Sequence, residues 1–207
     1  MQYLIDKSPK DVERKQQLHP SLVTGQLLTP LTRYRNAKKR FGVDNGCFKR
    51  FDLKSFKSLI EREENNMEQC LFVTVPDIVA SARRTMEIWK RRFELLPFLR
   101  CWRLALVIQD GMEDLEIPWD DLHAVFLGGG DPWKDSQAAK DIIKTAKILN
   151  KHTHIGRVNT IKRYKSFSDI GADTCDGSGV SMYDHMLEDI AAGLSKKPEP
   201  TLFDEAV

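Results

Sequence analysis

Short apolar runs alternate with amphipathic segments along most of the chain. The apolar runs predict buried strands at residues 22–28, 41–43, 70–75, 104–108, 124–127, 154–158 and 172–175. The segments between them predict helices at residues 54–64, 78–96, 136–149, 161–168 and 182–194. Strands that alternate with helices at this spacing, and that are apolar at nearly every position, are typical of a parallel sheet with both faces covered.

Two closures fit this order of elements: an open doubly wound sheet and a (β/α)8 barrel. About seven candidate strands are more than the usual open sheet has, and polar residues recur at the strand carboxyl ends, where a barrel keeps its active site. We therefore predict an α/β fold, a compact (β/α)8 TIM-like barrel. No strand clearly follows Asp176, so the eighth strand comes from Gln2–Ile5 or is missing.

The composition is that of an ordinary globular protein. A chain of 207 residues suits one substantial core, so we expect a single domain with a polar leader at 1–20 and a loose tail at 196–207. The four cysteines are scattered without a Cys-x-x-Cys pair, which argues against a zinc site or a disulfide framework. Neither a secretion signal nor a membrane span is apparent, so we expect a cytoplasmic protein with no membrane partner.

Basic residues gather in one part of the chain, although the net charge is only +2. Binding to a polyanion would therefore depend on local patches. The densest cluster holds Arg33, Arg35, Lys38, Lys39 and Arg40. A solvated surface is the plain interpretation of such a cluster, and phosphate binding is the functional one. Lys49 and Arg50 extend it, and Lys162, Arg163 and Lys165 form a second candidate patch.

Polar residues and glycines follow the predicted strands at their carboxyl ends. They are Asp44, Asp77, Gln109, Gly128, Gly129, Gly130, Arg157 and Asp176. Because the strands of a barrel end at one mouth, we expect these residues to share one site. Each is also a common loop residue when taken alone, as Asp-Gly is a frequent turn dipeptide. Three carboxylates at close range repel one another and raise at least one pKa, which is typical of a site that serves a substrate.

Several chemistries compete for such a site. The chain lacks the Gly-x-x-x-x-Gly-Lys-Ser/Thr and Gly-x-Gly-x-x-Gly loops, so nucleotide hydrolysis and nicotinamide redox chemistry lose support. The carboxylates of Asp44, Asp77 and Asp176 could hold magnesium or manganese, which keeps a metal-dependent hydrolase as a rival. Carboxylates also cleave glycosidic bonds without metal, one as nucleophile and one as proton carrier. For His152 and His154, which lie near a predicted strand end, a structural role is favoured.

Five segments give the chain a more specific resemblance. They are Asp44-Asn45-Gly46, Val75-Pro76-Asp77, Ile108-Gln109-Asp110-Gly111, Leu127-Gly128-Gly129-Gly130 and Gly171-Ala172-Asp173-Thr174-Cys175-Asp176. In this order they resemble the active-site segments of the guanine transglycosylases, which install 7-deazaguanines in nucleic acid. The likeness covers residues 41–179. The tRNA enzymes carry a cysteine-rich zinc site after the nucleophile, and here no cysteine follows Asp176. The chain thus looks most like the DpdA-like DNA-modifying relatives, which bacteriophages often encode.

The resemblance implies a base exchange by double displacement. It implies that Asp176 is the nucleophile that attacks C1′ of the sugar and that Asp44 is the general acid/base. The groups implied to contact the base are Asp77, Gln109, Gly128, Gly129 and Gly130. Arg157 is a candidate for a phosphate or sugar contact. The substrate would be DNA, whose guanine is exchanged for preQ0 or a similar base, with no cofactor or metal.

Other possibilities stay open at this stage. The same chemistry could act on tRNA or on a free nucleoside. A non-catalytic nucleic-acid-binding or partner subunit is an alternative from another class. A homodimer or partner proteins are compatible with the sequence, and the host cytoplasm would be the location of a phage-encoded protein.

Overall fold

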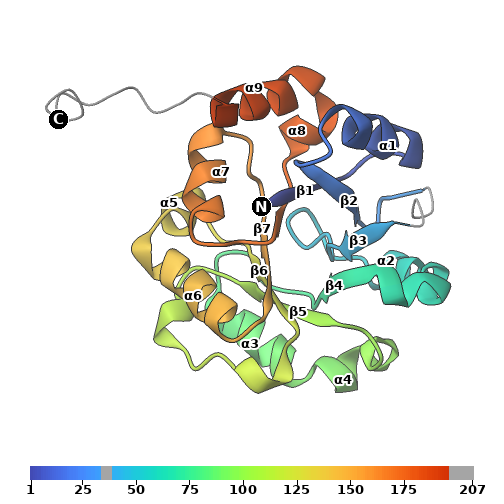
Figure 1. Ribbon diagram of the computed structural model, residues 1–207. Coiled ribbons are helices and arrows are strands. Elements are labelled where there is room, and N and C mark those ends of the chain that lie inside the picture. Colours follow the sequence, from blue (N-terminus) through green and yellow to red (C-terminus); the bar gives the residue numbers. More distant parts are fainter. Residues whose placement is uncertain (34–38, 196–207) are drawn as a thin grey trace, which may run out of the picture.

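Eight parallel strands form a closed barrel with helices around its outside (Figure 1). The strands are β1 (Gln2–Ile5), β2 (Val23–Leu28), β3 (Arg40–Val43), β4 (Cys70–Thr74), β5 (Leu104–Ile108), β6 (Ala124–Leu127), β7 (His152–Ile155) and β8 (Thr174–Cys175). The computed structural model describes residues 1–33 and 39–195. Neighbouring strands pair in sequence order, and β1 closes the ring by pairing with both β2 and β8. The predicted α/β barrel is confirmed, and its eighth strand is present.

The helices lie on the outer side of the barrel, where α1 to α7 connect successive strands and α8 and α9 follow β8. They are α1 (Pro9–Leu18), α2 (Leu53–Arg62), α3 (Ala82–Lys90), α4 (Arg92–Leu95), α5 (Asp131–Lys134), α6 (Gln137–Ile148), α7 (Ile161–Ser168), α8 (Ser178–Met182) and α9 (Asp184–Ser195). Within the described residues, no helix has the length and apolar character that a membrane crossing requires. Residues 1–20, expected as a polar leader, instead contain β1 and α1. Their polar composition reflects α1, in which only Val12 and Lys15 are buried. The tail expected at residues 196–207 lies outside the described residues.

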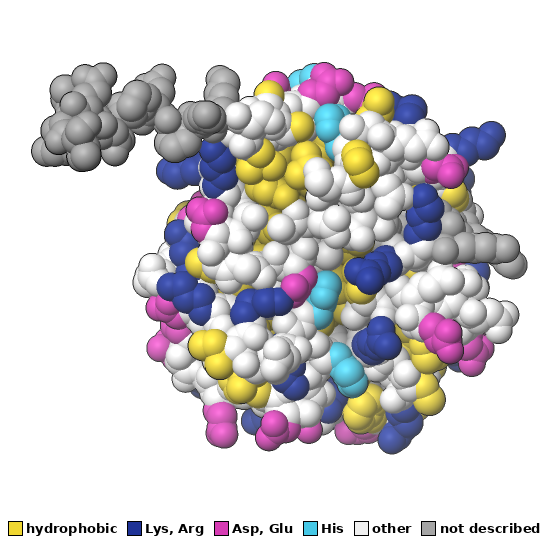
Figure 2. Space-filling view, in the orientation of Figure 1, with side chains coloured by type: hydrophobic (Ala, Val, Ile, Leu, Met, Phe, Trp, Pro, Cys, Tyr) yellow, Lys and Arg dark blue, Asp and Glu magenta, His cyan; other side chains and the backbone are white. Residues whose placement is uncertain are grey.

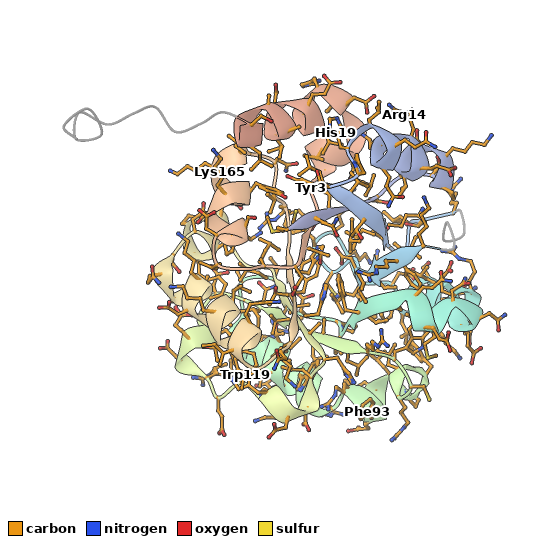
Figure 3. All side chains as sticks on the ribbon, in the orientation of Figure 1. Tyr3, Arg14, His19, Phe93, Trp119 and Lys165 are labelled. Atoms are coloured by element: carbon orange, nitrogen blue, oxygen red, sulfur yellow. The ribbon has the colours of Figure 1, made fainter. Side chains whose placement is uncertain are left out.

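Side-chain alternation along the strands decides which residues reach the barrel interior. The interior cluster consists of Leu4, Leu27, Phe72, Ala105, Val107, Ala124 and Phe126, whereas neighbours such as Leu106 pack toward the helices. Side chains fill the space that the strands enclose (Figure 3). Along a strand, the residue two positions after an inward-facing residue also faces inward. Where the strand ends, this residue lies at the carboxyl end of the barrel. For four strands that position is Asp44, Gln109, Gly128 and Asp176.

The segment between β4 and β5 departs from the prediction of one helix at residues 78–96. The helix begins only at Ala82, because Ala80 has a left-handed backbone conformation with φ of 57°. The sequence pattern also predicts a buried stripe of Val79, Met86, Trp89 and Phe93 on this helix; Met86 and Trp89 are buried, but Val79 is 41% exposed. The loop before α3 leaves Asp77 free to turn into the barrel mouth.

Candidate active site

A cavity of about 340 Å³ lies at the carboxyl end of the barrel. Its wall brings together the predicted site residues Asp44, Asp77, Gln109, Gly128, Gly129, Arg157 and Asp176. Gly130 is not part of the wall; its backbone N–H donates to Oδ2 of Asp110 over 2.7 Å. A volume of this size suits a single small ligand, since ligand sites commonly measure about 300–1,000 Å³.

Asp44 follows β3, and the pKa of its carboxyl group is strongly raised. Burial raises its pKa from 3.8 to about 7, although the backbone N–H of Gly46 opposes the shift by donating to Oδ1 over 2.8 Å. The nearby carboxylates of Asp176 and Asp77 contribute to this raised pKa. A group with such a pKa can both donate and accept a proton near neutral pH, as general acid/base catalysis requires.

Asp77 is held by two neutral amides. Asn45 Nδ2 donates to Oδ1 over 2.9 Å, and Gln109 Nε2 donates to Oδ2 over 2.6 Å. Burial raises the pKa of Asp77, and these donors partly offset the shift. Gln109 Oε1 accepts from the backbone N–H groups of Ala80 and Gly129, so the direction of its amide is fixed. These contacts make a rigid polar wall, to which Asn45 belongs although the sequence analysis assigned it no role within the Asp44-Asn45-Gly46 segment.

The glycine segment after β6 leaves no room for side chains. A Cβ on Gly128 would lie 2.8 Å from Nε2 of Gln109. Gly129 has φ of +71°, and a Cβ there would lie 2.6 Å from a ring carbon of Trp133. The backbone itself therefore borders the cavity beside the Asp77 and Gln109 wall, at two of the glycines for which the resemblance implies a base contact.

Asp176 presents its carboxylate to the cavity from the end of β8. Its side chain is 17% exposed, and Oδ1 accepts from the backbone N–H of Arg157 over 3.2 Å and lies 3.1 Å from Nε2 of His154. The backbone is fixed to β7 and the loop after it, since Asp176 N–H donates to Ile155 and the Asp176 carbonyl accepts from Val158. Among the described residues, none donates to Oδ2.

Arg157 lies at the mouth of the cavity. Its backbone has a left-handed conformation, with φ of 60°. Its guanidinium donates to the Gly129 carbonyl, lies 3.7 Å from Oδ1 of Asp131 and stands 5.1 Å above the ring of Phe48. Phe48 follows β3 and is 66% exposed. This pair joins loops from opposite sides of the barrel and borders the entrance of the cavity.

Lys134 is a charged wall residue that the sequence analysis missed. Its side chain is fully buried, and Nζ donates to the Gly156 carbonyl over 2.7 Å. Burial, with a smaller contribution from the Arg157 cation, lowers its pKa to about 8, and the Asp176 carboxylate opposes the shift. Its place three residues after Asp131 in a Pro-containing turn gave no sign that it would return to the barrel.

The basic cluster is divided between the two ends of the barrel: Lys49, which extends it, lines the mouth cavity, whereas Arg40 does not. Arg33 is exposed just beyond β2, and Lys39 donates to Oε1 of Gln16 over 2.6 Å. Arg40 opens β3 and lines a separate cavity of about 190 Å³ with His152 at the amino end of the barrel. Because strand starts and strand ends lie at opposite ends of the barrel, Arg40 is separated from the predicted site. Arg35 and Lys38 lie outside the described residues.

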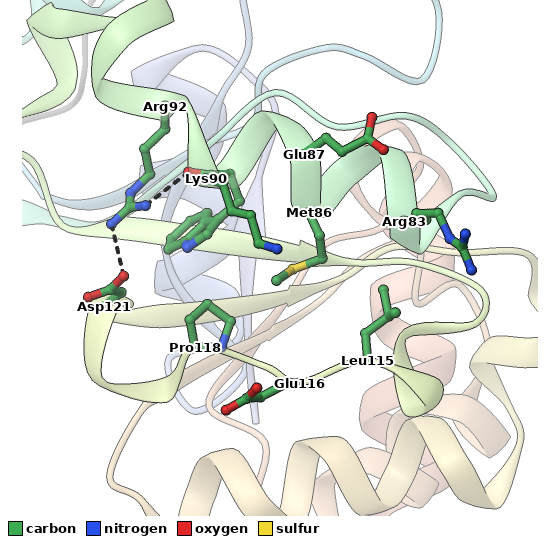
Figure 4. Close-up of a pocket in the computed structure, with 10 residues that line it drawn as sticks. Arg83, Met86, Glu87, Lys90, Arg92, Leu115, Glu116, Pro118 and Asp121 are labelled. Atoms are coloured by element: carbon green, nitrogen blue, oxygen red, sulfur yellow. Dashed lines mark hydrogen bonds and ion pairs between the residues drawn. The ribbon is translucent and has the colours of Figure 1, made fainter.

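A cavity larger than the one at the mouth lies elsewhere. It measures about 520 Å³ and lies in the outer layer, between α3 and the segment before β6 (Figure 4). Arg92 crosses it, with NH1 donating to the Trp89 carbonyl and NH2 lying 3.6 Å from Oδ2 of Asp121. No strand-end residue of the barrel mouth reaches this cavity. The smaller cavity at the mouth is therefore the one that the predicted site residues line.

Within the described part of the chain, no group of three or more His, Cys, Asp or Glu side chains is arranged to hold a metal ion. Both carboxylate oxygens of Asp77 accept from amides, which explains why it does not converge with Asp44 and Asp176 as a ligand. No protein-family model matches the chain, and no curated protein matches it. The motifs and the geometry of the mouth are therefore the basis for a functional proposal.

Proposed function

We propose that the protein is a base-exchanging transglycosylase that replaces guanine in DNA with a 7-deazaguanine such as preQ0. One observation carries the proposal: Asp44 and Asp176 line the same small cavity, next to the polar wall of Asp77 and Gln109. An acid/base with a pKa near neutrality and a carboxylate with an uncommitted oxygen are the two groups that double displacement at a glycosidic bond needs.

The first displacement breaks the bond between guanine and deoxyribose. Oδ2 of Asp176 attacks C1′ and forms a deoxyribosyl ester, while the bonding electrons leave with N9 of guanine. Protonated Asp44 gives its proton to the departing base and becomes a carboxylate. The pKa of about 7 allows Asp44 to hold this proton at neutral pH.

The second displacement reverses the roles. Ionised Asp44 removes the proton from N9 of the incoming 7-deazaguanine, and N9 attacks C1′ and expels the Asp176 carboxylate. One N-glycosidic bond has then replaced another, and both acids have returned to their initial states. The exchange balances without ATP or a redox cofactor.

The wall beside Asp44 suits the edge of a purine. Asp77 offers carboxylate oxygens and Gln109 an amide in a fixed orientation, and a planar base pairs with such donors and acceptors along its edge. The bare backbone of Gly128 and Gly129 lets the base approach closely. A site built to bond polar edges discriminates strongly against bases that leave its buried groups unpaired.

A cavity of 340 Å³ has no room for a duplex. The target nucleotide would be flipped out of the helix into the mouth, at a cost of a few kcal/mol of unstacking. The choice of DNA over tRNA rests on the resemblance to the DNA-modifying relatives. Exchange on tRNA or on a free nucleoside is the second candidate, because the same residues would perform it.

Base exchange can be measured with labelled preQ0 or guanine and three acceptors: duplex DNA, single-stranded DNA and tRNA. We expect label to enter DNA with the wild-type protein, in the presence or absence of EDTA. Asp176→Asn should abolish incorporation, and Asp120→Asn, at an exposed site of the outer layer, should retain it. Incorporation into tRNA alone would select the second candidate, and binding of DNA without incorporation would favour a non-catalytic subunit. EDTA-sensitive hydrolysis would favour a metal-dependent enzyme.

A further inference from the structure

A chain of polar side chains runs through the barrel interior behind Asp176. His154 Nε2 lies 3.1 Å from Oδ1 of Asp176, and His154 Nδ1 lies 2.9 Å from Oγ1 of Thr174. The same Thr174 oxygen lies 2.9 Å from Nε2 of His152. These residues alternate along the neighbouring strands β7 and β8, so all four side chains lie on the inner face. The chain connects the mouth with the opposite end of the barrel.

The surroundings of His154 leave it little freedom. Its side chain is fully buried, its ring stacks on Phe126 at 4.7 Å between centroids, and the Phe72 ring lies 4.9 Å away. Apolar rings therefore cover its faces, and only the two ring nitrogens meet polar partners. Burial also lowers the pKa of His154, although the Asp176 carboxylate opposes the shift, so the ring is neutral at neutral pH.

Hydrogen-bond chemistry then fixes the position of each proton. A carboxylate oxygen can only accept, so a neutral His154 that bonds Asp176 carries its single ring hydrogen on Nε2. Nδ1 is consequently an acceptor and takes the one hydroxyl hydrogen of Thr174. Oγ1 of Thr174 must in turn accept from the Nε2 hydrogen of His152. Every donor in the chain points toward Asp176.

The far end of the chain lies at the amino end of the barrel, where neutral His152 makes no hydrogen bond to the nearby Asp173 carboxylate. His152 Nδ1 lies 4.0 Å from Oδ2 of Asp173, and this carboxylate accepts from Lys147 Nζ over 2.6 Å and from Thr153. Arg40 lines the same small cavity. In the orientation of Figure 1, the space-filling view shows histidine, acidic and basic side chains together near the middle of the visible face (Figure 2).

We infer that His154 is a positioning residue for Asp176 and that Thr174 and His152 hold it in the donating tautomer. With the His154 ring and the Arg157 backbone N–H both on Oδ1, the carboxylate cannot rotate, and Oδ2 is the oxygen presented to C1′. The part played in base exchange rests on the proposed function. The proton arrangement itself does not, because it follows from these contacts together with the neutral state of the buried His154 ring.

The tautomers can be measured without any substrate. In ¹⁵N-labelled protein at pH 7, two-bond ¹⁵N–¹H correlations should show His154 and His152 neutral, each with its hydrogen on Nε2. Thr174→Val, which keeps the shape but removes the hydroxyl, should change the nitrogen shifts of both rings, and Thr174→Ser should restore them. A hydrogen on Nδ1 of His154, or a charged His154 ring, would overturn the inference.

Kinetics test whether the chain serves Asp176. His154→Phe and Thr174→Val should slow covalent adduct formation by about 10- to 100-fold while KM for the base changes less than about threefold, because a hydrogen bond to a charged group is lost. Thr174→Ser should stay within about threefold of the wild type, and His154→Gln, which offers a donor near the Nε2 position, should recover part of the rate. Circular dichroism and melting curves identify any variant that fails to fold.

The two assays separate the possible failures. A His154→Phe variant that folds and forms the adduct at the wild-type rate would refute the positioning role. A wild-type protein that exchanges no base, but whose His154 carries the Nε2 hydrogen, would refute the proposed function and still support the orientation of Asp176.

Discussion

The two ends of the barrel use similar residues in opposite ways. At the amino end, burial acts to raise the pKa of Asp173, but Lys147 and the Thr153 backbone N–H outweigh it and lower the pKa. At the carboxyl end, Asp44 and Asp77 face backbone or amide donors and other acids, and burial raises both pKa values. An acid paired with a cation stabilises the fold, whereas acids gathered without a partner cation are typical of a site that acts on a ligand.

The largest expected effect comes from a matched pair of variants at the two ends. Asp176→Asn should lower the rate of base exchange by at least about 10³-fold, because the amide cannot form the ester intermediate. Asp173→Asn should retain exchange within about threefold and lose about 1 kcal/mol of stability with the Lys147 ion pair. Radiolabel incorporation and urea unfolding measure the two effects. A comparable loss of exchange activity in both variants would contradict the proposed difference in role between the two ends of the barrel.

Replacing the acid/base should have the next largest effect. Asp44→Asn should lower the exchange rate by about 10²- to 10³-fold, since a positioned general acid typically contributes that much. With base analogues that are better leaving groups, Asp44→Asn should lower the exchange rate less, because departure of these bases depends less on protonation. The measurement is single-turnover kinetics with guanine and with such an analogue. Equal losses for both leaving groups would show that Asp44 does not transfer the proton.

The free energy of unfolding should change with pH in opposite directions for Asp44 and Asp173, the acids at the two ends of the barrel. Folded Asp44 has the higher pKa, so between pH 3.8 and about 7 the folded state binds more protons and the free energy of unfolding falls as pH rises. Asp44→Asn should therefore be more stable than the wild type by about 2 kcal/mol at pH 8, and the gain should vanish near pH 4.

Asp173 should give the reverse sign. Its pKa is lowered on folding, so its stabilising effect is present at neutral pH and is lost as the pH falls below its ordinary value. Asp173→Asn should thus be less stable than the wild type at pH 7 and nearly equal to it at pH 3. Urea unfolding across this range gives both curves, and parallel curves for Asp44→Asn and Asp173→Asn would contradict the assigned environments.

The smallest expected effect concerns DNA binding. Arg157→Ala should weaken DNA binding by about three- to tenfold and reduce the salt dependence by about one charge, because this cation stands at the mouth. Arg40→Ala, at the amino end, should leave affinity unchanged. Fluorescence anisotropy at several salt concentrations measures both. A loss of affinity in Arg40→Ala alone would place the DNA surface at the wrong end of the barrel.

The chain pattern predicted the barrel and most of its mouth, because both follow from local rules. Apolar runs marked the strands, and a residue just past a parallel strand has only one end of the barrel to reach, which located Asp44, Gln109 and Asp176. The same rule, applied to Arg40 at the start of β3, would have predicted that Arg40 lies at the opposite end of the barrel from the mouth.

What the sequence did not predict depends on long-range packing. Lys134 returns to the wall through the turn of α5, and Asn45 joins Asp77 only after β3 and β4 pair. His154 looked like a structural histidine, and its contact with Asp176 arises from the register of β7 against β8. The helix expected at residues 78–96 begins only at Ala82. The loop before it is held by the left-handed backbone of Ala80, whose N–H donates to Oε1 of Gln109.

The most direct measurement is mass spectrometry of the protein after incubation with DNA and acid quenching. We predict a deoxyribosyl ester on the peptide that contains Asp176, which disappears when guanine or preQ0 is added before the quench. Base exchange that proceeds without this adduct, or an adduct on any other residue, would contradict the proposed mechanism.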